Sequence, residues 1–371
     1  METKKYRFDE VTINFDKKRI PLSSAQREKR QGTFRYYGAQ GVIDHVDDYI
    51  FDGTYLLIAE DGENLKSKKQ NIAQVVDGQF WVNNHAHIVQ GNEQCDTRFL
   101  CYLINSMDLS GYVTGSAQPK LSQANLNAVT LSLPTLAEQK RIVEYLYMLD
   151  QKIDVNRQIN DNLQQQAAAL FSSLYDRSNT EVRFTDLIQI LGGGTPKTGE
   201  NTYWNGNIAF FTPKDVGTPY TLITEKTISK EGLSHCNSRL YPVNTVFVTA
   251  RGTVGKVGMS GVPMAMNQSC YALVGKETHQ LLVYFYTLKA VDRLKHKASG
   301  AVFDAITTRD FESEQIMKLS HDDATAFLRV AEPMFQEALN NNIENLRLST
   351  LRDSLLPKLM SGEIDVSAVQ L

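Results

Sequence analysis

Basic, amide and aromatic side chains gather in a few turn-rich segments of this 371-residue chain. Arginine and lysine donate hydrogen bonds to guanine and to phosphate oxygens, and glutamine pairs with the edge of adenine. Exposed loops that carry these residue types could therefore read double-stranded DNA through its major groove.

The candidate DNA contacts fall in both halves of the chain. In the first half they are Arg27, Lys29, Arg30, Arg35, Tyr36, Tyr37, Gln40, Lys66, Lys68, Lys69, Gln118 and Lys120. In the second half they are Thr195, Lys197, Tyr203, Trp204, Lys214, Arg251 and Lys256. The competing interpretation of each is a solvated surface position or, for aromatic residues such as Tyr203 and Trp204, packing in a core.

Signatures of catalysis and of cofactor binding are missing from the sequence. There is no Asn/Asp-Pro-Pro-aromatic tetrapeptide to hold a flipped base, and no G-x-G-x-x-G for a dinucleotide. The stretch around Arg251 is similar to a phosphate-binding loop, but Ala250 replaces its first glycine and Val257 its final Ser/Thr. We therefore expect no catalytic residue and no cofactor.

Two histidines raise the question of a metal site. His85 and His87 alternate along an expected strand, so their side chains would share a face and could begin such a site. No third ligand is near in sequence, which favours a packing or DNA-facing role. Disulfides and zinc sites are not expected, because the cysteines include no C-x-x-C pair; they are Cys95, Cys101, Cys236 and Cys270.

The second half of the chain retraces the first, which predicts two similar α/β modules. A strand followed by a turn is expected at 51–62 and again at 241–255. A short strand beginning near Asn83, and near Asn267 in the repeat, then leads to a helix with matching apolar spacing.

A long helix is expected after each module. Thr135 and Glu138 form a capping box behind Pro134, and Ser320 with Asp323 forms a weaker one. Both helices carry a heptad seam typical of a coiled coil, and Pro357 should kink or end the second near Ser361. The seam residues are Ile142, Leu146, Leu149, Ile153, Asn156, Asn160, Leu163, Leu170, Asn341, Asn345, Leu348 and Leu355.

The seam asparagines predict a register. If the helices pack antiparallel, Asn156 faces Asn345 and Asn160 faces Asn341. A buried asparagine costs stability but specifies one alignment, since only that alignment gives its amide a partner. The alternative is a solvated midpoint.

Several segments together carry a family resemblance. The first module holds YYGAQGVIDHVDDYIFDG and FWVNNHAHIV, and the second opens with GGTP followed by YW. The helical segments contribute LPTLAEQKRIVEYL, LDQKID and the closing LRDSLLPKLMSGEIDV. This set, in this order and across nearly the whole chain, resembles the specificity subunits of type I restriction-modification enzymes.

The resemblance implies a non-catalytic DNA-binding subunit with an α/β (α+β) fold and a pseudo-symmetric repeat. Residues 1–134 and 177–319 would be recognition domains that each read half of a bipartite, asymmetric site. Residues 135–176 and 320–360 would be spacer helices in an antiparallel coiled coil, and 361–371 a tail. The helices would set the half-site spacing and dock two methyltransferase (modification) subunits, and restriction (translocase-nuclease) subunits would join through that core.

Two other classes of protein remain open. One is the specificity subunit of a related fused or type II-like system, in which this chain would itself carry a nuclease or methyltransferase site. The missing motifs argue against that class. The other is an assembly scaffold that binds no DNA, against which the basic loops argue.

Composition indicates where the chain is located and how its charge is distributed. Its apolar fraction of 42% suffices for packed cores, and it has no apolar run of about eighteen residues and no signal-peptide h-region. We therefore expect a cytoplasmic protein. The formal net charge of −3 argues against a free-standing nucleic-acid binder, so the basic residues should lie in local patches.

Overall fold

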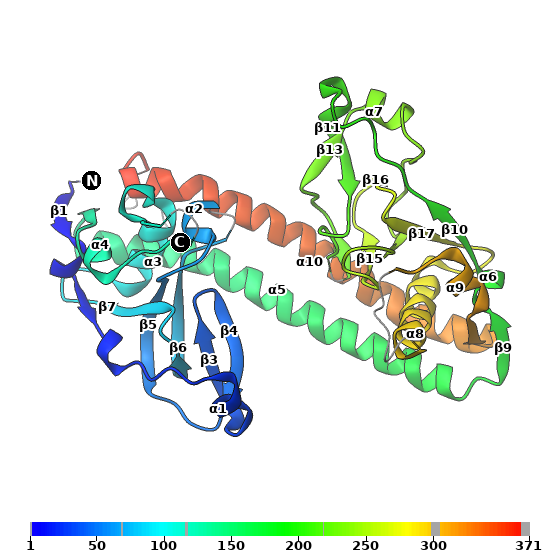
Figure 1. Cartoon of the computed structure of the whole chain (residues 1–371), viewed down its shortest axis with the longest axis horizontal. Coiled ribbons are helices and arrows are strands. Elements are labelled where there is room, and N and C mark those ends of the chain that lie inside the picture. Colours follow the sequence, from blue (N-terminus) through cyan, green and yellow to red (C-terminus); the bar gives the residue numbers. More distant parts are fainter. Residues whose placement is uncertain (1, 68–69, 116–117, 218, 298–304, 365–371) are drawn as a thin grey trace. The chain divides into compact units, whose positions relative to one another are not determined.

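The structure, a computed structural model, describes residues 2–67, 70–115, 118–217, 219–297 and 305–364. Contacts divide the chain into two compact units, Met1–Gln151 with Leu348–Leu371, and Lys152–Arg347. Each unit combines an α/β module with parts of two 41-residue helices, α5 (Leu136–Asp176) and α10 (His321–Ser361) (Figure 1).

The first module is built on a six-stranded sheet with the order β2-β7-β5-β6-β3-β4. Neighbouring strands are antiparallel except β3 and β6, which run parallel. A separate antiparallel pair joins β1 to β8. The strands are β1 (Lys4–Arg7), β2 (Thr12–Asn14), β3 (Gln31–Gly38), β4 (Gly41–Val46), β5 (Phe51–Ala59), β6 (Ala73–Val82), β7 (Ala86–Gly91) and β8 (Thr130–Leu133).

Short helices cover this sheet, and α3 is the main one. Asp96 caps α3 by accepting from the backbone N–H groups of its first turn, and four apolar side chains of α3 are buried. The helix packs against β5, β6 and β7. The helices of the module are α1 (Ser24–Glu28), α2 (Asn64–Ser67), α3 (Thr97–Ser106) and α4 (Gln123–Asn127), with 3-10 turns η1 (Phe8–Glu10), η2 (Asp16–Lys18) and η3 (Ser110–Tyr112).

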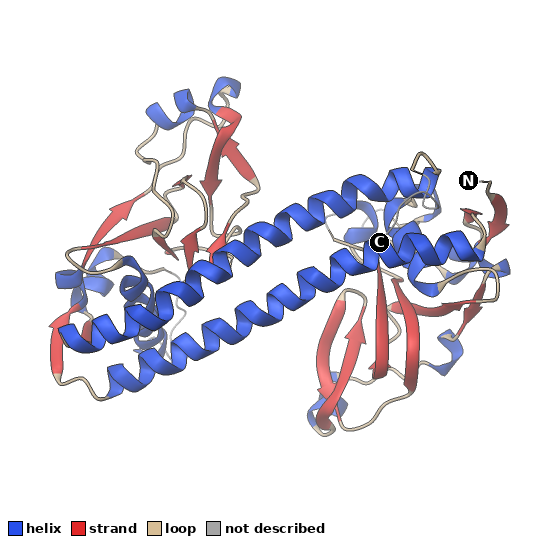
Figure 2. Ribbon diagram, turned by 180° about the vertical axis from the view of Figure 1, so that it is seen from behind, coloured by secondary structure: helices blue, strands red, loops and turns tan. Residues whose placement is uncertain are grey.

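The second module has the same connectivity in its core but two sheets, ordered β10-β17-β14-β15-β12 and β13-β11-β16 (Figure 2). Here β9 pairs with β18, as β1 pairs with β8. The strands are β9 (Thr180–Arg183), β10 (Ile188–Gly192), β11 (Trp204–Phe211), β12 (Tyr220–Thr221), β13 (Lys226–Ile228), β14 (Val246–Thr249), β15 (Val257–Ser260), β16 (Met264–Met266), β17 (Cys270–Gly275) and β18 (Gln315–Lys318). The helices are α6 (Phe184–Leu187), α7 (Lys230–Ser234), α8 (Gln280–Lys297) and α9 (Thr308–Ser313), with the 3-10 turn η4 (Asn201–Tyr203).

A proline explains why the second module has two sheets where the first has one. Strand β6 is continuous and pairs with β5 on one side and β3 on the other. Its counterpart consists of β15, which pairs with β14, and β16, which pairs with β11. Pro263 lies between them and has no N–H for a ladder, so one long strand becomes two short ones.

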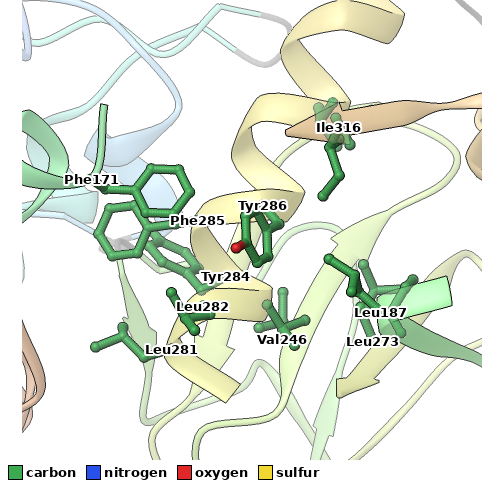
Figure 3. Close-up of a cluster of buried hydrophobic side chains, with 14 of the residues drawn as sticks. Phe171, Leu187, Val246, Leu273, Leu281, Leu282, Tyr284, Phe285, Tyr286 and Ile316 are labelled. Atoms are coloured by element: carbon green, nitrogen blue, oxygen red, sulfur yellow. The ribbon is translucent and has the colours of Figure 1, made fainter. Parts of the chain in front are cut away.

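The core of the second unit is aromatic and centres on α8. The rings of Phe285 and Phe171 stack with centroids 4.9 Å apart, which attaches α8 to α5 (Figure 3). Phe285 also meets Phe335 of α10 at 5.6 Å. In the first unit, Ile142 and Leu146 of α5 are fully buried in the core that α3 also lines.

Both long helices begin at the capping boxes expected from the sequence. The hydroxyl of Thr135 accepts from the N–H of Glu138 (3.4 Å), whose carboxylate accepts from the N–H of Thr135 (2.9 Å). The hydroxyl of Ser320 accepts from the N–H of Asp323 (3.1 Å). The second helix passes through Pro357 and ends at Ser361, so the proline does not end it.

The helices are antiparallel, and amides meet at their seam. The Nδ2 group of Asn156 donates to Oδ1 of Asn345 (2.9 Å), and that of Asn341 donates to Oδ1 of Asn160 (2.9 Å). These are the partners that the antiparallel heptad pattern predicts. Asn156 and Asn160 are buried, which rules out a solvated midpoint.

The remaining seam positions differ in burial. Ile142, Leu146 and Ile153 are buried, whereas Leu149, Leu163, Leu170, Leu348 and Leu355 are half-buried, because two helices cannot enclose every seam side chain. Arg352 interrupts the heptad pattern and donates to Asp150 (2.6 Å), which also accepts from the hydroxyl of Tyr102 (2.5 Å). That network joins α3 to both long helices within the first unit.

Of the described helices, none combines the length and the apolar composition that crossing a lipid bilayer requires.

Candidate nucleic-acid interface

Three segments of the first module meet where β5 ends and β7 begins. The backbone N–H of Glu60 donates to the carbonyl of His85 (2.9 Å), and the N–H of Leu121 donates to the carbonyl of Glu60 (2.8 Å). An isolated bridge then pairs Asp61 with Lys120. We call this meeting point of the 60–62, 83–85 and 118–121 segments the first junction.

The second module repeats this junction at the ends of β14 and β17. The N–H of Ala250 donates to the carbonyl of Ser269 (2.8 Å), and the N–H of Ile306 donates to the carbonyl of Ala250 (2.9 Å). An isolated bridge pairs Arg251 with Ala305. The 250–252, 267–269 and 305–306 segments therefore form an equivalent second junction.

An asparagine turn shapes each junction. The N–H of Asn83 donates to the carbonyl of Tyr37 in β3, and the N–H of Asn267 donates to the carbonyl of Phe211 at the end of β11, both at 3.0 Å. The Oδ1 atom of each accepts from the N–H two residues on, at 2.8 Å and 3.0 Å. Strands β7 and β17 therefore begin three residues after these asparagines and not at them, because each asparagine forms an Asx turn before the strand.

The side chains that the two junctions carry differ in chemistry. In the first module, Asp61 follows Glu60 and faces Lys120 across the bridge. In the second module, Arg251 follows Ala250 and faces Ala305. The two modules therefore share a backbone frame and present different groups on it.

Four candidates of the first module lie around its junction and are exposed: Gln40, Lys66, Gln118 and Lys120. Lys66 Nζ donates to the carbonyl of Gly115 (2.9 Å), and Lys120 Nζ pairs with Glu60 (3.2 Å). Gln40 occupies the β3–β4 turn, against Gly62. Lys68 and Lys69, also predicted contacts, lie outside the described residues.

In the second module, Thr195, Lys214, Arg251 and Lys256 lie on adjoining loops and are exposed or half-buried. The hydroxyl of Thr253 donates to the carbonyl of Pro213 (3.2 Å), which ties the Arg251 loop to the Lys214 loop. Thr195 donates to the side chain of Gln268, a junction residue that was not among the predicted DNA contacts.

Other candidates of the second module lie at the far end of β11. The eight residues of β11, at about 3.3 Å each, separate Trp204 from the junction by about 25 Å. The Trp204 ring meets Phe210 edge-on at 5.5 Å, and its Nε1 donates to the carbonyl of Lys197 (3.1 Å). Tyr203 stacks on His235 at 4.9 Å. Packing accounts for both aromatic rings, while Lys197 is exposed.

Arg27, Lys29 and Arg30 lie at the opposite end of β3 from Gln40. Arg27 Nε pairs with Asp44 (2.8 Å) and lowers the pKa of that carboxyl. Arg30 Nε pairs with Asp47 (2.9 Å), and its guanidinium lies 4.8 Å from the centre of the Trp81 ring. Both arginines hold α1 and β3 in place, whereas Lys29 is exposed.

Two tyrosines offered as DNA contacts are core residues instead. Tyr36 is 0% exposed and Tyr37 is 5% exposed. Consecutive strand residues point to opposite faces, so burial of both means that β3 is covered on its two faces there. Arg35, their neighbour, is exposed and donates to the carbonyl of Asp77 (2.7 Å).

The histidine pair does not share a strand face. His85 lies in the turn before β7 and pairs with Asp61 (2.6 Å), while His87 is buried in β7 between Asp16 and the carbonyl of Leu121. Across the described ranges, no cluster of three His, Cys, Asp or Glu side chains could hold a metal ion.

The four cysteines are free thiols. Burial raises the pKa of Cys95 and of Cys270 to about 12, so neither thiol ionises near neutral pH.

The sequence did not predict the ion pairs that lie behind the first junction. Arg19 pairs with Glu60 (3.0 Å) and also donates to the carbonyl of Ala86 (2.9 Å). Burial raises the pKa of Glu60, but its hydrogen bonds from Arg19 and Lys120 and the charges nearby outweigh burial and lower it. No sequence spacing links Arg19 to Glu60, so only the fold reveals the pair.

Comparison with known proteins places the repeat in a family. The model for the type I restriction modification DNA specificity domain matches twice, at residues 2–165 and 177–318. The first match covers the first module and part of α5, and the second covers the second module, beginning after α5 ends and ending before α10 begins.

Individual relatives agree with this match. A Haemophilus influenzae protein named as a candidate type I restriction enzyme specificity subunit, S.HindORF215P, is 36% identical over 138 residues, which are 37% of this chain and 35% of that protein. The HindI specificity subunit of the same organism is 24% identical over 84% of both chains. The crystal structure of a type I specificity subunit from M. genitalium superposes with a TM-score of 0.62 and 13% identity, covering 97% of this chain and 96% of that one, so the two share a fold.

Proposed function

Since this chain belongs to the type I restriction-modification DNA specificity family, we propose that each of its two modules reads one half of a bipartite, asymmetric DNA site. The recognition domains are residues 1–134 and 177–319. The spacer helices are 135–176 and 320–360, followed by a tail at 361–371.

The duplicated junction is the observation that carries this proposal. Equivalent backbone hydrogen bonds hold equivalent loops in the two modules, with Leu121 bonded to Glu60 and Ile306 bonded to Ala250. Two modules with the same backbone arrangement can read different half-sites if their side chains supply different hydrogen-bond donors and acceptors. Asp61 of the first module and Arg251 of the second occupy equivalent positions, and they supply an acceptor and a donor respectively.

The charge around each junction supports contact with DNA. In the first module, Gln40, Gln118 and Lys66 supply amide and ammonium donors, and in the second, Arg251 and Lys256 are exposed on one loop. Glutamine pairs with adenine and arginine with guanine, whereas lysine commonly contacts phosphate. We assign base contacts to Gln40, Gln118 and Arg251, and phosphate contacts to the lysines.

The helix pair supports a role as spacer and docking surface. A helix of 41 residues extends over about 60 Å at ~1.5 Å per residue, and the paired asparagines hold one register. Val155 and Ile159 lie four residues apart on α5 and are 48% and 40% exposed. Such an apolar stripe on a polar helix suits contact with another protein, and we assign it to a methyltransferase subunit.

In this scheme the chain works in the cytoplasm with double-stranded DNA, two methyltransferase subunits and restriction subunits. It binds no cofactor and carries no catalytic residue, because methyl transfer and cleavage belong to the partners.

Titration of the purified complex with duplex DNA tests the proposal. The chain is co-expressed with a methyltransferase subunit, and the affinity for fragments of host DNA is measured at several salt concentrations. We expect a minority of fragments to bind tightly and the rest weakly with a steep salt dependence. A complex that binds no DNA would support the scaffold alternative, and nuclease or methyltransferase activity of the chain alone would support the fused-enzyme alternative.

A further inference from the structure

A buried histidine stands directly behind the first junction. His87 is 1% exposed, its Nδ1 lies 2.6 Å from Oδ2 of Asp16, and its Nε2 lies 2.8 Å from the carbonyl oxygen of Leu121. Leu121 is the residue whose own N–H bonds to Glu60 at the junction. The ring therefore connects η2 to the segment that carries Gln118 and Lys120.

The two partners fix the protonation of this ring. A carbonyl oxygen and a carboxylate oxygen are both acceptors, so both ring nitrogens must carry a proton for both bonds to form. Asp16 Oδ1 already accepts from the N–H of Ile88 (2.8 Å), which is the pattern of an ionised carboxylate. His87 is thus an imidazolium paired with a buried carboxylate.

Several charged groups face this pair. Arg19 NH2 lies 3.5 Å from Oδ2 of Asp16, and its NH1 pairs with Glu60. Glu60 in turn pairs with Lys120. On the neighbouring turn, His85 pairs with Asp61. The carboxylates of Asp16 and Glu60 favour the protonated form of His87, although Arg19 approaches the same Oδ2 atom of Asp16 that His87 contacts.

The described part of the second module has no equivalent of this pair. Tyr271 stands where His87 does, since it pairs with Val248 as His87 pairs with Ile58. Its ring meets Phe311 edge-on at 6.3 Å, and the residue in the place of Leu121 is Ile306, which is buried among apolar groups. The second junction is therefore supported by packing and the first by an ion pair.

We propose that His87 is a positioning residue of the first module: as an imidazolium it fixes the Gln118–Leu121 segment, so that recognition by the first module, but not by the second, depends on protonation. This inference rests on the proposed function, because it assumes that the segment contacts DNA. His87 itself touches no DNA.

The direction of the pH dependence follows from the bonds. Burial lowers the pKa of His87, but the hydrogen bonds to Asp16 and the Leu121 carbonyl and the charges of Asp16 and Glu60 outweigh burial and raise it above 6.5. A raised pKa means that the stabilisation is complete below 6.5 and is lost as pH rises through the folded value. The pKa of Asp16 is lowered from 3.8, because bonds from His87 and Ile88 outweigh burial, so Asp16 stays ionised throughout the neutral and alkaline range.

The protonation claim is tested on the full chain by the ring proton signals of its histidines in NMR spectra, from about pH 5 to 10. The signal that disappears in His87→Gln identifies the residue. We expect it to titrate above 6.5, and in Asp16→Asn to titrate at lower pH than in the wild type. A His87 signal that titrates at or below 6.5 overturns the proposal.

The positioning claim is tested on the complex with its methyltransferase subunit. The probes are duplexes that carry a site selected by the complex from a random pool at about neutral pH. We expect the affinity to fall about tenfold above the His87 pKa, the scale of one charge-assisted hydrogen bond, with hydroxyl-radical protection lost at one half-site only. Asp16→Asn should move the midpoint of this fall to lower pH.

Matched variants separate positioning from general effects. His87→Gln should bind weakly at all pH values and lose the pH-dependent fall, whereas His296→Gln, at an 80% exposed side chain of the second module, should behave as the wild type does. If both half-sites lose protection together, or if the affinity is independent of pH while His87 titrates, His87 does not position this segment. If no duplex is selected at any pH, the proposed function fails and this inference fails with it.

Discussion

At the scale of single residues, what separates the DNA-contact candidates is how each side chain is already engaged. Arg27 and Arg30 satisfy their guanidinium groups with aspartates and aromatic rings inside the first module. Arg251 is exposed on a loop that a neighbouring loop braces through Thr253. A side chain that must bind an external partner needs exposure and a fixed base, and Arg251 has both.

Arg251→Ala should weaken the binding of DNA by the complex by about 1–3 kcal/mol and relax base preference at one position of one half-site. The measurement is affinity for the selected site and for all single-base variants of it. Arg183→Ala is the matched control, since Arg183 is exposed in β9, away from the junction. Equal losses in the two variants would mean a general charge effect and would remove Arg251 from the interface.

Residue types and turn signals predicted only some of the residues that lie at the junctions. Gln40, Gln118, Lys66 and Arg251, which residue type and loop context predicted as contacts, lie at the junctions. Tyr36 and Tyr37 were misplaced, because a tyrosine pair in a strand has the same sequence pattern whether one face or both faces are covered. The Asp16–His87 pair is separated by 71 positions, so no local pattern could reveal it.

At the scale of elements, the long helices are tied into the cores of the two units. Leu146 of α5 is fully buried with Leu359 of α10 in the first unit, whereas Met148, two residues on, is 42% exposed. Asn156 shows the cost of specificity: among the described residues its Oδ1 atom has no hydrogen-bond partner. The seam therefore gives up some stability for a single register.

Leu146→Asp should destabilise the first unit by about 3–5 kcal/mol, because it buries a charge without a partner. Thermal unfolding of the full chain measures this effect, and co-purification with the methyltransferase subunit measures assembly. Met148→Asp is the control on the same helix and should unfold as the wild type does. If Leu146→Asp retains its stability and assembles but selects a different site, the seam would belong to recognition instead.

Element types were predictable where periodicity is long, and sheet pairing was not. The heptads and capping boxes located both 41-residue helices and paired their asparagines correctly. The division of the second module into two sheets depends on Pro263, whose missing N–H matters only once β15 and β16 are known to align with one strand of the first module.

At the scale of the whole molecule, the duplication suits the proposed role, in which one chain reads an asymmetric site. The two modules share strand registers, asparagine turns and junction hydrogen bonds, while the side chains at the junctions differ. In the proposed scheme, the length of the two long helices sets the spacing between the half-sites, so deletions in the helices should change that spacing.

Removing one heptad from each helix, residues 157–163 and 338–344, should shorten the gap between the half-sites by about three base pairs. Seven helical residues span about 10 Å. They complete two helical turns to within about 20°, so the deletion should change the orientation of the modules little. The deletions are opposite each other in the antiparallel register, so Asn156 still meets Asn345. A gap of unchanged length in the site that the deletion variant modifies would contradict the spacer role.

The central claim is that this chain chooses a split DNA site with two different halves. The most direct measurement is to co-express it with its methyltransferase subunit and to map modified bases across the host DNA by single-molecule sequencing. We predict a modified motif made of two unlike half-sites with a fixed gap, absent when the chain is omitted. A soluble complex that modifies no motif dependent on this chain, or one continuous or palindromic motif, would contradict the account.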